Sequence, residues 1–177
     1  MQQFVIEGGY PLSGEVTPSG SKNAALKMLA ACLLTDAPVT LDNMPDILDV
    51  RTLIQIMTEL GVAIEWTAPD QLRVHACEIT STQVDPQLAG KLRSSIVLAG
   101  PLLARCGRVD LPVPGGDAIG ERRLDMHAFA LRQLGAQITF DGGVFKMRAE
   151  RLNGADILLA EASVTATENA IMAAVLA

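Results

Sequence analysis

An internal repeat is the feature that most constrains the fold of this chain. Residues 52–64 and 126–138 both read as an amphipathic helix followed by Leu-Gly, a small residue, one further residue and Ile. The two glycines, Gly61 and Gly135, lie 74 positions apart. Each is expected just past a helix end, where a left-handed backbone favours Gly. An alternating strand, a polar turn and a second strand are predicted after each glycine.

The repeat extends upstream of these glycines. Ala/Leu-rich helices are predicted over 23–34 and 93–105, and each is followed by a short strand. A third such helix begins at Thr167, again 74 positions after Arg93, and the chain ends inside it without a cap. The unit is therefore strand, helix, strand, helix, strand, strand, with two complete copies and a truncated third. Such units form an α/β fold by burying their apolar faces against each other.

Charge and composition narrow the possible function classes. The net charge of −6 disfavours general nucleic-acid binding, although a local cationic cluster can still hold a small anion. The sequence shows no basic and apolar leader, and no uncharged apolar run of about 18 residues. Cys32, Cys77 and Cys106 have neither metal-binding nor disulfide spacing. We therefore expect a cytoplasmic protein without metal, cofactor, nucleic-acid or membrane partners.

Helix starts provide candidate anion sites. The segment 18–25, PSGSKNAA, opens a helix whose free N–H groups and partial positive charge attract anions. Lys22 is electrostatically disfavoured in this first turn unless an anion lies beside it. The alternative is an ordinary helix capped by Ser21. Segments 91–95 and 162–169 open the two equivalent helices, and they are either similar binding edges or simple caps.

A glycine-rich loop over 111–127 is the next candidate, because it carries four residues more than its counterpart in the first unit. Arg122 and Arg123 can bind phosphate or carboxylate, and Asp117 lies between the glycines. His127 begins the following helix and is expected to line the site. The spacing matches neither a phosphate loop nor a dinucleotide fingerprint, so a solvated glycine-rich turn remains the alternative.

Four segments in this order make the chain resemble the UDP-N-acetylglucosamine enolpyruvyl transferases: SGSKNAAL at 19–26, LRSSIVLAGPLLAR at 92–105, PGGDAIGxR at 114–122 and SVTATEN at 163–169. The resemblance covers essentially the whole chain. It is closer than the resemblance to the sibling 3-phosphoshikimate enolpyruvyl transferases, which share the Ser-Lys helix start.

The resemblance implies a longer, two-domain enzyme built from βαβαββ units, with helices inside and sheets outside. Residues 1–21 would supply strands to the other domain, including one at 14–17. Residues 22–177 would form most of one domain. Its repeats would lie near 22–80, 85–150 and, truncated, 155–177.

The implied activity transfers enolpyruvyl from phosphoenolpyruvate to the 3-hydroxyl of UDP-N-acetylglucosamine and releases phosphate, as the first committed step of peptidoglycan synthesis. The alternatives are the phosphoshikimate reaction and a non-catalytic domain that binds nucleotide sugar. By resemblance, Asp117 is the catalytic residue. The resemblance also implies a set of substrate-binding positions: Lys22, Asn23, Arg93, Arg122, Arg123, Leu124, Asp125, Met126, Glu161, Ala162, Ser163 and Val164.

Three positions depart from the family pattern. Asp117 stands where most members have a cysteine that adds to phosphoenolpyruvate and reacts with fosfomycin, so fosfomycin resistance is predicted. Arg123 and Leu124 replace a frequent Pro-Val, and Glu161 replaces a Lys of some members. Because the catalytic base belongs to the missing C-terminal half, this chain alone is expected to be weakly active or inactive. Its exposed apolar surface could support a homodimer.

Overall fold

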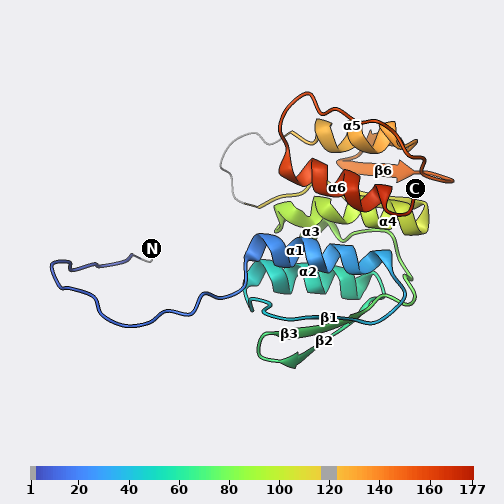
Figure 1. Ribbon diagram of the computed structural model, residues 1–177. Coiled ribbons are helices and arrows are strands. Elements are labelled where there is room, and N and C mark those ends of the chain that lie inside the picture. The colour runs from blue at the N-terminus through green and yellow to red at the C-terminus, as the bar shows by residue number, and fades with distance from the viewer. Residues whose placement is uncertain (1–2, 117–122) are drawn as a thin grey trace.

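The computed structural model describes residues 3–116 and 123–177, which form an α/β structure of helices and small antiparallel sheets (Figure 1). The first repeat contains two helices, a short 3₁₀ extension and a three-stranded sheet in the order β1-β3-β2. Its elements are α1 (Lys22–Ala31), η1 (Cys32–Leu34), β1 (Val39–Leu41), α2 (Leu48–Glu59), β2 (Ala63–Ala68) and β3 (Gln71–His75).

The second repeat has the same plan, with a sheet in the order β4-β6-β5, and the third is represented by one helix. The second repeat begins with a short extra helix, and its first long helix is 3₁₀ before it becomes α-helical. The elements are α3 (Pro86–Ala89), η2 (Arg93–Leu98), α4 (Ala99–Cys106), β4 (Arg108–Pro112), α5 (Asp125–Gln133), β5 (Gln137–Asp141), β6 (Val144–Arg148) and α6 (Val164–Ala174).

The two Leu-Gly helix ends are confirmed as equivalent. Gly61 and Gly135 follow α2 and α5 with φ of +102° and +98°, which L side chains rarely adopt. At Gly61 a Cβ would also lie 2.6 Å from Thr80 Oγ1, so both the backbone conformation and the lack of space disfavour a side chain there. Each glycine turns the chain directly into the strand that was predicted after it.

The core lies between the helices and the inner faces of the sheets. Helix α1 packs on α2, while α6 packs on both α4 and α5. On β3, Leu72 and Val74 are fully buried and Arg73 between them is exposed, so each sheet presents one face to solvent. Figure 1 shows the β1–β3 sheet outside α2, in agreement with the predicted arrangement of helices inside and sheets outside.

The opening strands of the repeats are the main departure from the prediction. The strand predicted at 14–17 is not formed, because residues 3–20 contain no helix or strand and are largely exposed. A strand requires a partner for its N–H and C=O groups, and the described chain offers this segment none. In the second repeat the opening strand is reduced to one parallel bridge between Gln83 and Asp110. The observed unit is therefore αβαββ.

The third helix also differs from its predicted bounds. Helix α6 begins at Val164, three residues before the predicted start at Thr167, because the Ser163 side chain caps it. It ends at Ala174, and the Val175 N–H still donates to the Ile171 carbonyl beyond that residue. None of the helices in the described part of the chain has the length and apolarity needed to cross a bilayer.

Candidate functional site

Three equivalent helix starts converge on one pocket of about 660 Å³. Helices α1, η2 and α6 follow the N-cap residues Ser21, Leu92 and Ser163, and these caps are each 71 positions apart. The spacing of the starts is therefore 71, whereas the Leu-Gly ends are 74 apart. The repeat places three N-terminal helix ends at the same cavity.

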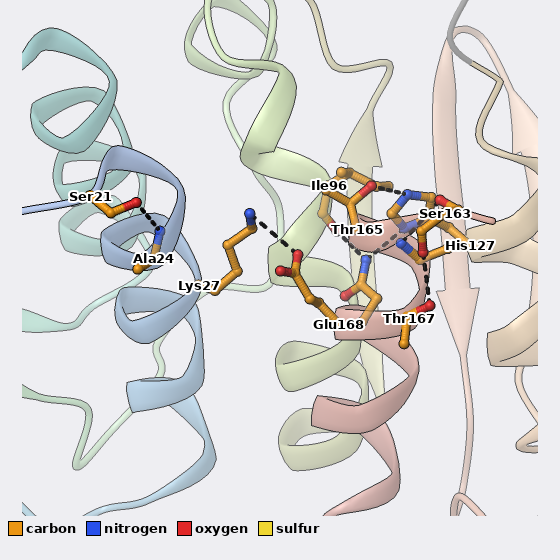
Figure 2. A network of polar contacts seen from close by, with 11 residues as sticks. Ser21, Ala24, Lys27, Ile96, His127, Ser163, Thr165, Thr167 and Glu168 are labelled. Atoms are coloured by element: carbon orange, nitrogen blue, oxygen red, sulfur yellow. Dashed lines mark hydrogen bonds and ion pairs between the residues drawn. The ribbon is translucent and has the colours of Figure 1, made fainter.

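Two of the helix starts are capped in the same way. The Ser21 hydroxyl accepts a hydrogen bond from the Ala24 N–H (Figure 2), and the Ser163 hydroxyl accepts one from the Ala166 N–H, both at 3.4 Å. Each serine engages one N–H of its first turn, and the other first-turn N–H groups have no partner within an α-helix. Their partial positive charge makes the pocket suitable for anions.

Basic side chains reinforce this charge, although the whole chain is acidic. Five basic side chains line the pocket: Lys22, Lys27, Lys91, Arg93 and Arg123. Among the described lining residues, Asp49 is the single acid. The Lys22 ammonium lies 2.9 Å from the Asp49 carboxylate at the start of α2. A ligand carrying two or more negative charges would therefore meet a local excess of positive charge.

An ion pair joins the first and third repeats beside this pocket. The Lys27 Nζ lies 3.4 Å from Glu168 Oε2, and both side chains are more than two-thirds buried (Figure 2). Glu168 Oε2 is closed to solvent and has no hydrogen-bond partner among the described atoms. Lys27 is one helical turn beyond Asn23, so both side chains lie on the same face of α1.

His127 occupies the wall between α5 and α6. Its Nε2 lies 3.1 Å from Thr165 Oγ1, and its Nδ1 lies 2.9 Å from Asn169 Nδ2. Burial of the ring, with a smaller contribution from the nearby Arg93 guanidinium, lowers the pKa of His127 to about 4. The imidazole is therefore neutral at pH 7, and His127 lies in the pocket wall; that this wall is the functional site stays a prediction.

The structure brings six of the predicted site residues to the pocket wall: Lys22, Asn23, Arg93, Arg123, Ser163 and Val164. The other described candidates lie outside the lining. Leu124 packs against the core, Asp125 pairs with Arg123, and Met126 is half-buried. Glu161 and Ala162 are exposed before the cap of α6.

Two predicted residues, Asp117 and Arg122, lie outside the described residues, so their roles stay predictions. Sequence reasoning did not select Lys27 or Asp49. The four-residue spacing from Asn23 to Lys27 was an available signal for Lys27. Asp49 reaches the pocket through the packing of α2 on α1, which has no local signature. Over residues 3–116 and 123–177, no group of three His, Cys, Asp or Glu side chains is arranged to hold a metal ion.

Comparison with known proteins gives a consistent result. The sequence profile of the EPSP synthase (3-phosphoshikimate 1-carboxyvinyltransferase) family matches residues 6–177. A UDP-N-acetylglucosamine 1-carboxyvinyltransferase of Bradyrhizobium diazoefficiens is 55% identical over 99% of this chain, and one of Treponema denticola is 47% identical over all of it. The chain spans only 40% and 41% of the lengths of these relatives.

Solved structures show the same fold. The enolpyruvyl transferase NikO from Streptomyces tendae superposes with a TM-score of 0.77 at 25% identity, covering 96% of this chain and 39% of its own. An EPSP synthase from Acinetobacter baumannii superposes with a TM-score of 0.69 at 21% identity, over 90% of this chain and 37% of its own. The repeated α/β arrangement is thus shared beyond the range of high sequence identity.

Proposed function

The chain belongs to the EPSP synthase family, and on this premise we propose that it carries part of the substrate site of an enolpyruvyl transferase that acts on UDP-N-acetylglucosamine. The reaction moves enolpyruvyl from phosphoenolpyruvate to the sugar 3-hydroxyl and releases phosphate. Both substrates are anionic through phosphate groups. The observation that carries the proposal is the cationic pocket at which three helix starts meet.

The pocket provides phosphate recognition by two independent means. Backbone N–H groups at the starts of α1 and α6 are directional donors, whereas Lys22 and Arg93 supply full charges from α1 and η2. Arg93 can meet a phosphate with two parallel N–H bonds, which a lysine cannot do. This combination fits the diphosphate of a nucleotide sugar together with the phosphate of phosphoenolpyruvate.

Sequence similarity favours a nucleotide sugar over phosphoshikimate as the acceptor. The relatives that share 47% and 55% identity are named for UDP-N-acetylglucosamine, whereas the EPSP synthase structure shares 21%. Lys22 and Asn23 are proposed to face phosphoenolpyruvate and the sugar. Arg93, Ser163 and Val164 are proposed to face the nucleotide.

The chemistry further requires an acid for the enol carbon and a base for the sugar hydroxyl. Asp117 is the proposed acid and Arg122 the proposed phosphate ligand. An ordinary aspartic acid has a pKa of about 3.9, so Asp117 must lose water on substrate binding to hold its proton at pH 7. With a carboxylate in place of a thiolate, a complete enzyme of this sequence is expected to keep its activity after stoichiometric fosfomycin treatment.

Ligand selectivity of the chain tests the proposal. We expect UDP-N-acetylglucosamine to bind more tightly than shikimate 3-phosphate in calorimetric titrations. Arg93→Met should reduce that binding at least tenfold, as expected for loss of a charged hydrogen bond. Arg73→Met is the matched control, because Arg73 is exposed on β3 and pairs with Glu65. Preference for shikimate 3-phosphate, or equal loss in the control, would contradict the proposal.

Turnover and assembly are proposed separately. We expect the 177-residue chain alone to release phosphate at a negligible rate, because catalysis in this fold requires two domains to close on the substrate. In that state it is a nucleotide-sugar-binding domain.

A cytoplasmic location is proposed. A homodimer through the exposed Ile171 of α6 and Val175 just after this helix is also proposed, and sedimentation velocity would detect it.

A further inference from the structure

The side chain of Asn169 is completely buried between the second and third repeats. Its Oδ1 accepts a hydrogen bond from the Gly100 N–H at 2.7 Å, and its Nδ2 donates to the Ile96 carbonyl at 2.8 Å. The same Nδ2 lies 2.9 Å from His127 Nδ1. One amide therefore connects α6 with the η2–α4 junction and with α5.

These partners fix the orientation of the amide. A backbone N–H can only donate and a carbonyl can only accept, so Gly100 and Ile96 assign the oxygen and the nitrogen of Asn169 without ambiguity. The second proton of Nδ2 then points at His127 Nδ1. That nitrogen must accept, so it carries no proton.

The tautomer of His127 follows. A neutral imidazole with an unprotonated Nδ1 carries its proton on Nε2, and this proton is donated to Thr165 Oγ1 at 3.1 Å. The Thr165 hydroxyl accepts this bond and keeps its own proton to donate. Thr165 is half-buried in the first turn of α6, where it lines the cationic pocket. Both ring nitrogens of His127 are engaged, so His127 does not act as an acid or base here.

We propose that Asn169 and His127 are positioning residues that orient the Thr165 hydroxyl to donate its proton to an anionic oxygen of the nucleotide-sugar diphosphate. The chain of hydrogen bonds runs from the buried amide through the imidazole to the pocket wall. This inference rests on the proposed function, because the diphosphate is its ligand. Thr165 is the specificity-determining contact, and the two buried residues act through it.

The packing around the amide supports a requirement for precise placement. A Cβ at Gly100 would lie 2.4 Å from the Asn169 carbonyl oxygen and 2.8 Å from its Oδ1, so the second and third repeats approach as closely as a glycine permits. Purely apolar contact between α4 and α6 would not need a buried amide, an imidazole and a hydroxyl in series. The last member of the series is the one that reaches the pocket.

A double-mutant cycle on the 177-residue chain tests the proposal, with UDP-N-acetylglucosamine as the probe in calorimetric titrations. Thr165→Val removes the hydroxyl at nearly constant volume and should weaken binding about tenfold or more, whereas Thr165→Ser should retain it. Thr167→Val is the matched control, because the Thr167 hydroxyl is bonded to the Ser163 carbonyl at 2.8 Å. His127→Phe should weaken binding in the wild-type background but add little to Thr165→Val.

A second measurement needs no ligand. Two-bond ¹H–¹⁵N spectra of the His127 ring at pH 7 should show the proton on Nε2, and a proton on Nδ1 would overturn the inference. Equal binding by wild type and Thr165→Val would overturn it too, and so would additive effects of the two substitutions. If the wild-type chain, shown to be folded, does not bind the nucleotide sugar, the proposed ligand is wrong and this inference falls with it.

Discussion

Replacement of Asn169 by alanine is expected to destabilise the chain severely. The substitution leaves the Gly100 N–H, the Ile96 carbonyl and His127 Nδ1 without their partner, at a site closed to solvent. Each unsatisfied buried group costs about 1–3 kcal/mol, so the combined loss for the three groups is about 3–9 kcal/mol. The whole stability of a domain is about 5–15 kcal/mol, and the variant is therefore expected to be partly unfolded near 37 °C.

Urea unfolding is the appropriate assay for this variant, and two probes should be followed. Far-UV circular dichroism reports all helices, whereas the fluorescence of Trp66, the single tryptophan, reports the first sheet. Both transitions should move together to lower urea if the repeats unfold as one unit. Asn23→Ala is the control, because Asn23 is exposed on α1. A loss below 1 kcal/mol for Asn169→Ala, with an unchanged denaturant slope, would refute the reasoning.

Three further predictions concern stability. Gly100→Ala should cost about 1–3 kcal/mol through overpacking against α6, whereas Gly154→Ala, whose Cβ would meet open space, should be nearly neutral in thermal melts. Arg105→Met should cost about 1.5–3 kcal/mol, because the guanidinium donates to three main-chain carbonyls of the first repeat at 2.6–3.1 Å; a melting temperature equal to wild type would contradict this. Below pH 6.5 the unfolded chain binds a proton at His127 that the folded chain does not bind until about pH 4. The free energy of unfolding should therefore fall by up to about 3 kcal/mol as the pH is lowered from 6.5 to about 4. His127→Phe should lack this part of the pH dependence, and an unchanged dependence in urea titrations would count against the buried imidazole.

Local rules predicted much of the fold. The equivalence of Gly61 and Gly135 followed from helix-ending chemistry, and both adopt the left-handed backbone. The repeat also predicted three equivalent helix starts as binding edges or simple caps, and all three line one pocket. The helix starts and ends rest on interactions within a few residues, which a sequence expresses directly, whereas the meeting of the three starts depends on how the repeats pack.

The opening strands depend on partners distant in the sequence. Residues 14–17 form no strand within this chain, and the resemblance assigns them to the other domain, an assignment that stays a prediction. The predicted start of the third helix at Thr167 repeated the 74-residue spacing of the helix ends, whereas the observed helix starts are 71 residues apart.

The site showed the same limitation. His127 and Asn169 are 42 residues apart, and Lys27 and Glu168 are 141 apart. Neither pair has a spacing that indicates contact. Each depends on the close approach of the third helix to the first two, which only the assembled repeats provide.

The central claim is that the pocket shared by the three helix starts binds a nucleotide sugar, and an ¹H–¹⁵N correlation spectrum titrated with UDP-N-acetylglucosamine tests it most directly. The account predicts progressive shifts at the amides of Asn23, Arg93 and Val164, with little change at Arg73 on the outer sheet. A well-dispersed spectrum in which the pocket amides do not move, or move no more than Arg73, would contradict it.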